Sequence, residues 1–344
     1  MNNYLKEKQL SIGFNPKLGQ TFFDLLNNPK HRKYIHSYFF SLNTQFPGDG
    51  SGKNLYTAPS EISELIKNLN TYDIPANLLL NDKYAENNRL KFLNMVKDII
   101  NLDAVTVLSL NAAKEIKKIY PNVKVHLSVR YFDWAIEDFV ISGKELSINE
   151  ARKIIWEKTN EIIDSNKEFK YIDVINVSGA YSFNDFDLFS KIKNAGIQTK
   201  IIVNESCLAN RYLMFKHFEN TKSCYDGNCG ECYALEKYHQ WVNLTRNDIY
   251  KESIKYYHDI DIFKLSLRGA NLEETERVIS YYTSDEKTSF IRFNTSRTKI
   301  YLMDKCYKIF LEYIDQISKC SRNCFYCKKC KDYYEKLMKE NFLL

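Results

Sequence analysis

The sequence predicts an α/β fold, a (β/α)8 barrel of the TIM type that carries a helical insertion and a Cys-rich C-terminal extension. Short apolar runs alternate with amphipathic stretches over most of the 344 residues. The runs are almost continuously apolar, which is typical of parallel strands covered by helices on both faces. No run leads into a glycine-rich phosphate turn, because GDGSG at 48–52 opens no helix. This disfavours the competing fold, a doubly wound open sheet.

The expected strands are short runs rich in β-branched or aromatic residues. In chain order they lie at 34–40, 76–81, 104–110, 124–129, 171–179, 199–204, 261–267 and, with the least regular pattern, 289–293. We therefore expect an N-terminal segment at 1–33, the barrel at 34–299 and a separate tail at 300–344.

The expected helices are the amphipathic stretches between the runs. They lie at 60–69, 89–100, 111–120, 187–196 and 271–282, and a further one at 303–317 precedes the tail. Ser60 is the expected N-cap of the first helix, and Gly196 is the expected C-cap of the fourth. Two insertions interrupt the alternation, a helical one at 134–166 and a Cys-bearing one at 207–258.

Composition narrows the class of protein. Hydrophobic residues make up 44% and charged residues 27%, the balance of a globular chain rather than a disordered one. The net charge of +6 comes from interspersed residues, which weakens the case for a dedicated nucleic-acid module. No apolar run reaches the roughly 20 residues of a membrane-spanning helix. The first residues lack the apolar core of a signal peptide, so we expect a cytoplasmic protein without membrane contact.

The nine cysteines are the strongest chemical signal, because none precedes Cys207 and eight fall into two close groups. The first group is Cys207, Cys224, Cys229 and Cys232, and the second is Cys320, Cys324, Cys327 and Cys330. Four thiolates suit either tetrahedral zinc or an iron–sulfur cluster, and spacing does not separate the two. We expect one or two [4Fe–4S] clusters, with zinc as the alternative metal. The ninth, Cys306, falls in a helical pattern as a small apolar residue or an extra ligand.

The second group also resembles the motif of radical S-adenosylmethionine enzymes. Its first three cysteines have the spacing C-x3-C-x2-C, with Tyr326 before the third. In that family the motif follows the first barrel strand, whereas here it follows the last helix. Cys330 could instead supply a fourth ligand, and such a closed cluster would serve structure or electron transfer. S-adenosylmethionine therefore stays open as a cofactor.

Polar residues at the carboxyl ends of the expected strands would line the active site of such a barrel. The substrate-binding candidates are Asn81, Arg130, Ser178, Asn204 and Arg268. The two arginines would suit a carboxylate or phosphate, unless each is a surface cation beside an acidic neighbour such as Asp133.

Two further residues are candidates for catalysis. Lys264 lies within an apolar run, where a buried ammonium group needs a partner or a function. Glu205 could transfer a proton at a strand end, or its carboxylate could cap a helix. His36 and His126 lie inside apolar runs, and we expect them to be core histidines with satisfied hydrogen bonds.

Several segments together resemble the collagenase-like peptidase family of barrel proteins. They are HLSVRYFD at 126–133, INVSG at 175–179, IIVNESCLANRYLMFKH at 201–217, Cys224, and DIFKLSLRG at 261–269. The resemblance implies a barrel and either peptidase activity or the iron–sulfur chemistry of members that hydroxylate ubiquinone precursors and RNA bases without oxygen. It places Cys207 at the end of the sixth strand as a ligand. The His-Gly of the family is replaced here by Asn204-Glu205.

We therefore expect an iron–sulfur-dependent modifying enzyme with oxygen-independent, hydroxylation-type chemistry. Its substrate would be an anionic small molecule, a peptide or an RNA base at the barrel mouth, and its partners would include an electron-donor protein and a heteromeric subunit. Three alternatives stay open. They are a radical S-adenosylmethionine enzyme, a peptidase of the collagenase-like family, and a non-enzymatic binding protein stabilised by zinc.

Overall fold

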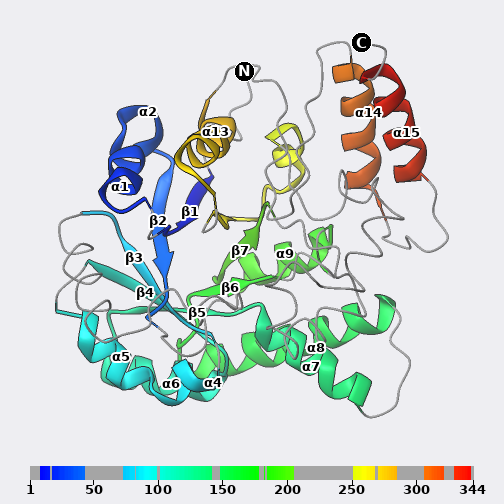
Figure 1. The fold of residues 1–344 in the computed structure, drawn as a ribbon. Coiled ribbons are helices and arrows are strands. Elements are labelled where there is room, and N and C mark those ends of the chain that lie inside the picture. The colour runs from blue at the N-terminus through cyan, green and yellow to red at the C-terminus, as the bar shows by residue number, and fades with distance from the viewer. Residues whose placement is uncertain are drawn as a thin grey trace.

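The fold is a closed barrel of eight parallel strands in chain order, within the residues that the structure describes (Figure 1). The computed structural model describes residues 8–15, 18–42, 73–81, 83–98, 101–141, 148–177, 182, 184–204, 251–267, 270–284, 306–320 and 329–341. The strands are β1 (Gln9–Gly13), β2 (Ile35–Phe40), β3 (Ala76–Leu80), β4 (Leu102–Val107), β5 (Lys124–Leu127), β6 (Val174–Asn176), β7 (Gln198–Ile202) and β8 (Ile262–Leu265). The pairing of β8 with β1 closes the barrel and excludes the open sheet.

The strands that form this barrel differ from the expected ones at both ends. The barrel begins with Gln9–Gly13, inside the 1–33 segment that we placed outside it, so the expected start at residue 34 is wrong. The strand is only five residues long, begins with the polar residue Gln9 and follows Lys8, so it forms no long apolar run. The expected strand at 289–293 lies outside the described residues. Lys264 consequently belongs to β8, and Cys207 follows β7.

Helices cover the outside of the barrel (Figure 1). They are α1 (Gln20–Asn27), α2 (Pro29–Arg32), α4 (Lys83–Asn87), α5 (Arg89–Val96), α6 (Leu110–Ile119), α7 (Arg130–Ile141), α8 (Ile148–Glu168), α9 (Phe186–Asn194), the 3-10 helix η3 (Lys251–Tyr256), α13 (Leu272–Thr283), α14 (Tyr307–Ser318) and α15 (Lys329–Asn341). The helical insertion consists of α7 and α8. The expected helix at 60–69, with Ser60, lies outside the described residues.

Local capping explains where several helices begin and end. Ser109 accepts a hydrogen bond from the Ala112 N–H at the start of α6. Asn271 and Glu274 form a reciprocal capping box at the start of α13. Gly196 follows α9 with φ of 73°, the left-handed conformation that the sequence predicted for it.

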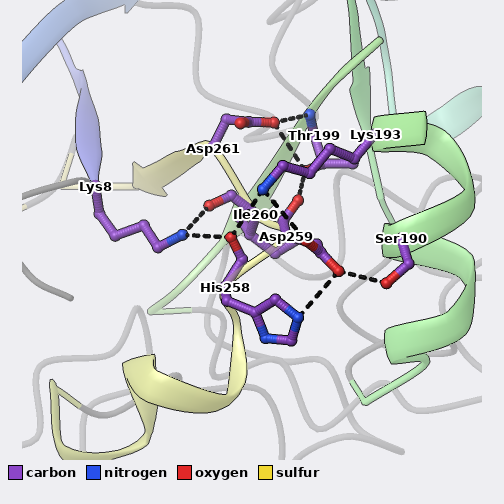
Figure 2. A network of polar contacts seen from close by, with 8 residues as sticks. All are labelled: Lys8, Ser190, Lys193, Thr199, His258, Asp259, Ile260 and Asp261. Carbon is purple, nitrogen blue, oxygen red and sulfur yellow. Dashed lines mark hydrogen bonds and ion pairs between the residues drawn. The ribbon is translucent and has the colours of Figure 1, made fainter. Parts of the chain in front are cut away.

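A polar network holds together the amino ends of β7 and β8 (Figure 2). Asp261 accepts hydrogen bonds from the backbone N–H of Thr199 at 2.8 Å and from its hydroxyl at 3.2 Å. The Lys8 ammonium, just before β1, donates to the carbonyls of His258 at 3.0 Å and Ile260 at 2.6 Å. This network therefore ties the first strand to the last at the end of the barrel that conveys stability rather than catalysis.

The last two helices form an antiparallel hairpin beside the barrel (Figure 1). The Tyr313 ring of α14 and the Tyr333 ring of α15 have centroids 5.7 Å apart. The Tyr256 hydroxyl of η3 donates to Asp315 of α14 at 3.0 Å, which fixes the hairpin to the segment before β8. Among the described helices, none has the length and apolar character needed to cross a membrane.

Candidate functional site

Two lysines from neighbouring strands point into the barrel interior. Lys200 of β7 and Lys264 of β8 are 1% and 9% exposed. Lys264 pairs with Ile202, so it lies one step nearer to the carboxyl end of the barrel than Lys200. The Lys264 Nζ lies 4.3 Å from the centroid of the Phe39 ring, and the Lys200 Nζ lies 5.9 Å from it. Both ammonium groups therefore face the same aromatic ring of β2.

Lys200 is held in place by a short chain of hydroxyl groups. Its Nζ donates a hydrogen bond to the Ser11 Oγ of β1 at 2.8 Å, and the Ser37 hydroxyl of β2 donates to the same oxygen at 3.1 Å. Burial holds the pKa of Lys200 well below its ordinary value, and repulsion by Lys264 lowers it further, while Asp103 acts in the opposite direction. The barrel interior therefore disfavours the charged form of Lys200 in comparison with a surface lysine.

His126 of β5 brings an open hydrogen-bond donor into the same interior. The Thr106 hydroxyl donates to Asn77 Oδ1 at 3.0 Å, and the Asn77 amide lies 2.9 Å from His126 Nδ1. With the amide in this orientation, Nδ1 accepts and the proton of the neutral ring sits on Nε2. Nε2 is buried and has no partner among the described residues. Burial first, and Lys200 second, hold the pKa of His126 well below its ordinary value.

The amino end of the barrel carries a second set of charged groups. Register shifts leave His36 as an extra residue of β2 and Asp103 as an extra residue of β4. Asp103 is bound by the Lys124 ammonium of β5, with the Nζ 2.9 Å from Oδ1. Burial first, and then Lys200, lower the pKa of His36. Asp103, whose charge raises the pKa of Lys200, is thus already engaged in an ion pair.

At the carboxyl end, two of the expected substrate-binding residues lie together. Arg130 begins α7 directly after β5, and its Nη1 donates to the Asn81 carbonyl at 3.1 Å. Its guanidinium carbon lies 6.0 Å from the Trp134 ring centroid. The Asn81 side chain is buried, and its Oδ1 has no partner among the described residues.

Asn204 has a different environment from the expected one. Its Nδ2 donates to the Ser266 carbonyl at 3.0 Å, and its Oδ1 accepts from the Ser266 N–H at 2.9 Å. The side chain therefore extends the pairing of β7 and β8 beyond the end of the ladder. Substrate contact by Asn204 stays a prediction, and its amide atoms already have partners.

Most of the expected metal ligands fall outside the described residues. These are Cys207, Cys224, Cys229, Cys232, Cys324 and Cys327, and the candidates Ser178, Glu205 and Arg268 fall outside them as well. Cys306 is buried beside α14, which suits its role as a small apolar residue. Within the described part of the chain, no three His, Cys, Asp or Glu side chains gather as a metal site.

The second cysteine group begins at the carboxyl end of the barrel. Cys320 follows α14, and its carbonyl accepts a hydrogen bond from the Asn184 amide in the connection between β6 and α9. Asn184 is itself held by Arg152, whose Nη2 lies 2.8 Å from the Asn184 Oδ1. Cys330 is the second residue of α15, so the helical hairpin brings the backbone at both ends of the group to one end of the pair.

Sequence reasoning named Lys264 as a candidate and did not name Lys200 or the open nitrogen of His126. The alternation of side chains along a strand was the available signal, because Lys200, Ile202 and Asn204 share one face of TKIIVN. The expectation that His126 has all its hydrogen bonds satisfied holds for Nδ1 and fails for Nε2.

Comparison with known structures yields distant structural neighbours. Neither a protein-family model nor a curated protein matches the chain. A U32 peptidase of known structure has a TM-score of 0.43 and 10% identity, covering 75% of this chain and 92% of its own. A 7,8-dihydropteroate synthase from Vibrio fischeri has a TM-score of 0.39 and 12% identity, covering 81% of this chain and 93% of its own. The barrel is established by its own strand order.

Proposed function

We propose that the chain is an enzyme that binds an anionic substrate inside the carboxyl half of the barrel and modifies it with electrons from cysteine-bound iron–sulfur clusters. The observation that carries the substrate half is the convergence of Lys200 and Lys264 on the Phe39 ring. An anion that enters from the carboxyl end would meet Lys264 first and Lys200 one step deeper. The His126 N–H would then bind it from a strand across the barrel.

The surrounding residues support this arrangement by fixing the donors before the substrate arrives. Asn77 and Thr106 orient the His126 ring, and Ser11 holds the Lys200 nitrogen. Donors that are already oriented in a site of low dielectric bind an anion more strongly than mobile surface groups. Arg130 adds a guanidinium group at the same end of the barrel, directly after β5.

The redox half of the proposal rests on the spacing of the cysteines. Bound clusters would supply single electrons, delivered by a donor protein. The backbone contact of Cys320 with Asn184 supports a cluster at the carboxyl end of the barrel, the end from which the proposed substrate would enter.

A second candidate function is peptide hydrolysis, which the hydrogen bond between Lys200 and Ser11 favours. A serine hydroxyl beside a lysine of lowered pKa is the arrangement of Ser–Lys hydrolases, in which the Lys200 amine would take the proton of the Ser11 hydroxyl as Ser11 attacks. Casein hydrolysis that survives removal of iron and disappears in Ser11→Ala would establish this alternative.

Binding of pyruvate and inorganic phosphate tests the substrate half. We expect either anion at 100 times its dissociation constant to stabilise the folded protein by about 2.7 kcal/mol. Lys264→Met should weaken that binding by about tenfold or more, since a charge-assisted hydrogen bond is lost. The measurement is the melting temperature as a function of anion concentration.

The matched control is Lys255→Met. The Lys255 ammonium also lies against an aromatic ring, 4.9 Å from the Tyr256 centroid, but on η3 outside the barrel. Its replacement should leave anion binding unchanged. If the anions stabilise the wild type, Lys264→Met and Lys255→Met equally, or stabilise none of them, the result would contradict a binding site in the barrel.

A further inference from the structure

We infer that Lys200 forms an imine with the carbonyl carbon of a 2-oxo acid, while Lys264 binds the carboxylate of the same molecule. The inference rests on the proposed function, because it names the class of anion that the barrel would take. It assigns Lys200 a covalent role in addition to its hydrogen bond with Ser11.

The placement of the two lysines carries the inference. Their Nζ atoms lie 4.3 and 5.9 Å from the Phe39 centroid, and the charge of Lys264 lowers the pKa of Lys200, so the two groups are close enough to interact. A 2-oxo acid carries its carbonyl carbon directly beside its carboxylate. Small side chains on the neighbouring strands, Ser11 and Ser37, face the same interior beside the two lysines.

The direction of entry assigns the two roles. Asp103 and Lys124 form an ion pair toward the amino end, and Lys264 lies nearer the carboxyl end than Lys200. A substrate that enters from the carboxyl end therefore reaches the more exposed Lys264 with its charged group. Its carbonyl carbon then lies toward the deeper Lys200 Nζ, which Ser11 holds at 2.8 Å.

A lysine acts as a nucleophile only as the neutral amine, and the surroundings of Lys200 shift its pKa in the direction of that form. Burial and the positive charge of Lys264 lower its pKa, and Asp103, which raises it, is already paired with Lys124. His126 is buried and its pKa is lowered as well, so it adds no positive charge near neutral pH. A desolvated lysine beside a second cation is a recognised way to activate an amine.

The reaction is a condensation without net oxidation. The Lys200 nitrogen lone pair forms a bond to the carbonyl carbon, and the π electrons of the carbonyl move to its oxygen. The nitrogen gives up its two protons, both of which end on that oxygen, and the carbon–oxygen bond breaks to release water. The products are one imine and one water molecule. The His126 Nε2–H would donate a hydrogen bond to the oxygen as it becomes negative.

Reductive trapping tests the inference on the purified full-length protein. Pyruvate or glyoxylate is added with sodium cyanoborohydride, which transfers a hydride to an imine carbon and makes the link permanent. Intact-mass measurement counts the adducts, and peptide mapping locates them. We expect one adduct per chain, on the peptide that contains Lys200, and none on the peptide that contains the exposed Lys255.

Two variants keep the test independent of folding. Lys200→Met should lose the adduct while its circular dichroism spectrum stays that of the wild type. Ser11→Ala retains Lys200 and should still be labelled there, at a rate lower by up to about tenfold, the effect of one lost hydrogen bond.

The outcomes separate this inference from the proposed function. Anion binding that depends on Lys264, with no adduct, would overturn the imine and leave the binding site intact. An adduct on Lys264, or equal labelling of surface lysines including Lys255, would also overturn the role of Lys200. Absence of both binding and adduct would remove the inference together with the substrate half of the proposed function.

Discussion

At the scale of single residues, burial decides the chemistry of the groups inside the barrel. Lys200, Lys264 and His126 lie where water is excluded, so each responds to its neighbours more strongly than a surface group would. The lowered pKa of Lys200 and that of His126 share burial as the first cause, and Lys200 contributes to that of His126. A change at one of these residues should therefore alter the behaviour of the others.

The first prediction concerns pH and His126. Its pKa in the folded protein lies well below the ordinary value near 6.5 because the ring is buried and Lys200 is close. Below about pH 6.5 the unfolded chain binds a proton that the folded ring does not. The free energy of unfolding therefore decreases as the pH is lowered through that window. In the wild type, His126 should lower the free energy of unfolding by up to about 1.4 kcal/mol for each pH unit of acidification. The variant His126→Gln should lack this contribution.

Urea unfolding of His126→Gln and of the wild type at pH 7.5 and pH 5.5 measures this effect. His31 and His36 also have lowered pKa values, through burial first, so part of the slope should persist in the variant. The same loss of stability in both proteins between these pH values would show that His126 does not titrate as proposed.

At the scale of elements, the sequence predicted the helices and most strands because their patterns repeat over many residues. The amphipathic stretches at 89–100, 111–120, 187–196 and 271–282 each correspond to a helix. The first strand, Gln9–Gly13, was missed because five residues without a long apolar run resemble a loop. The extra residues His36 and Asp103 could not be predicted, since a bulge depends on the register with a partner strand.

The candidate site was only partly predictable for the same reason. A polar residue at a strand end, such as Asn81 or Arg130, can be located once the strand is known. The face of β7 on which Lys200 lies depends on the register of the strand. A shift of that register by one residue would move Lys200 to the opposite face. The hydrogen bond from Lys200 to Ser11 joins β7 to β1, which are far apart in the sequence, so no local sequence pattern predicts it.

The second prediction concerns the end of α9. Gly196 has φ of 73° and no atom within 4 Å of the position that a Cβ would occupy. Gly196→Ala should therefore lower the free energy of unfolding by about 1 kcal/mol, through backbone strain alone. Gly196→Asn should lose less, because asparagine tolerates the left-handed conformation. Urea unfolding measures both, and equal losses in the two variants would argue against strain as the cause.

At the scale of the whole molecule, the polar network around Asp261 and the candidate residues Arg130 and Asn81 lie at opposite ends of the barrel. The network around Asp261 and Lys8 joins the strands at the amino end (Figure 2). Arg130, Asn81 and the backbone of Cys320 lie toward the carboxyl end. An enzyme in which electrons reach a substrate inside the barrel requires the clusters to lie on that second side.

The most direct test of the proposed enzyme is the metal content and absorption spectrum of protein purified without oxygen, with and without dithionite. The account predicts a brown protein with about eight irons and matching sulfide per chain, as two four-iron clusters contain, and bleaching on reduction. About four irons would assign a cluster to one cysteine group only. A colourless protein with about two zinc ions would contradict the electron-transfer half and favour a protein stabilised by structural zinc.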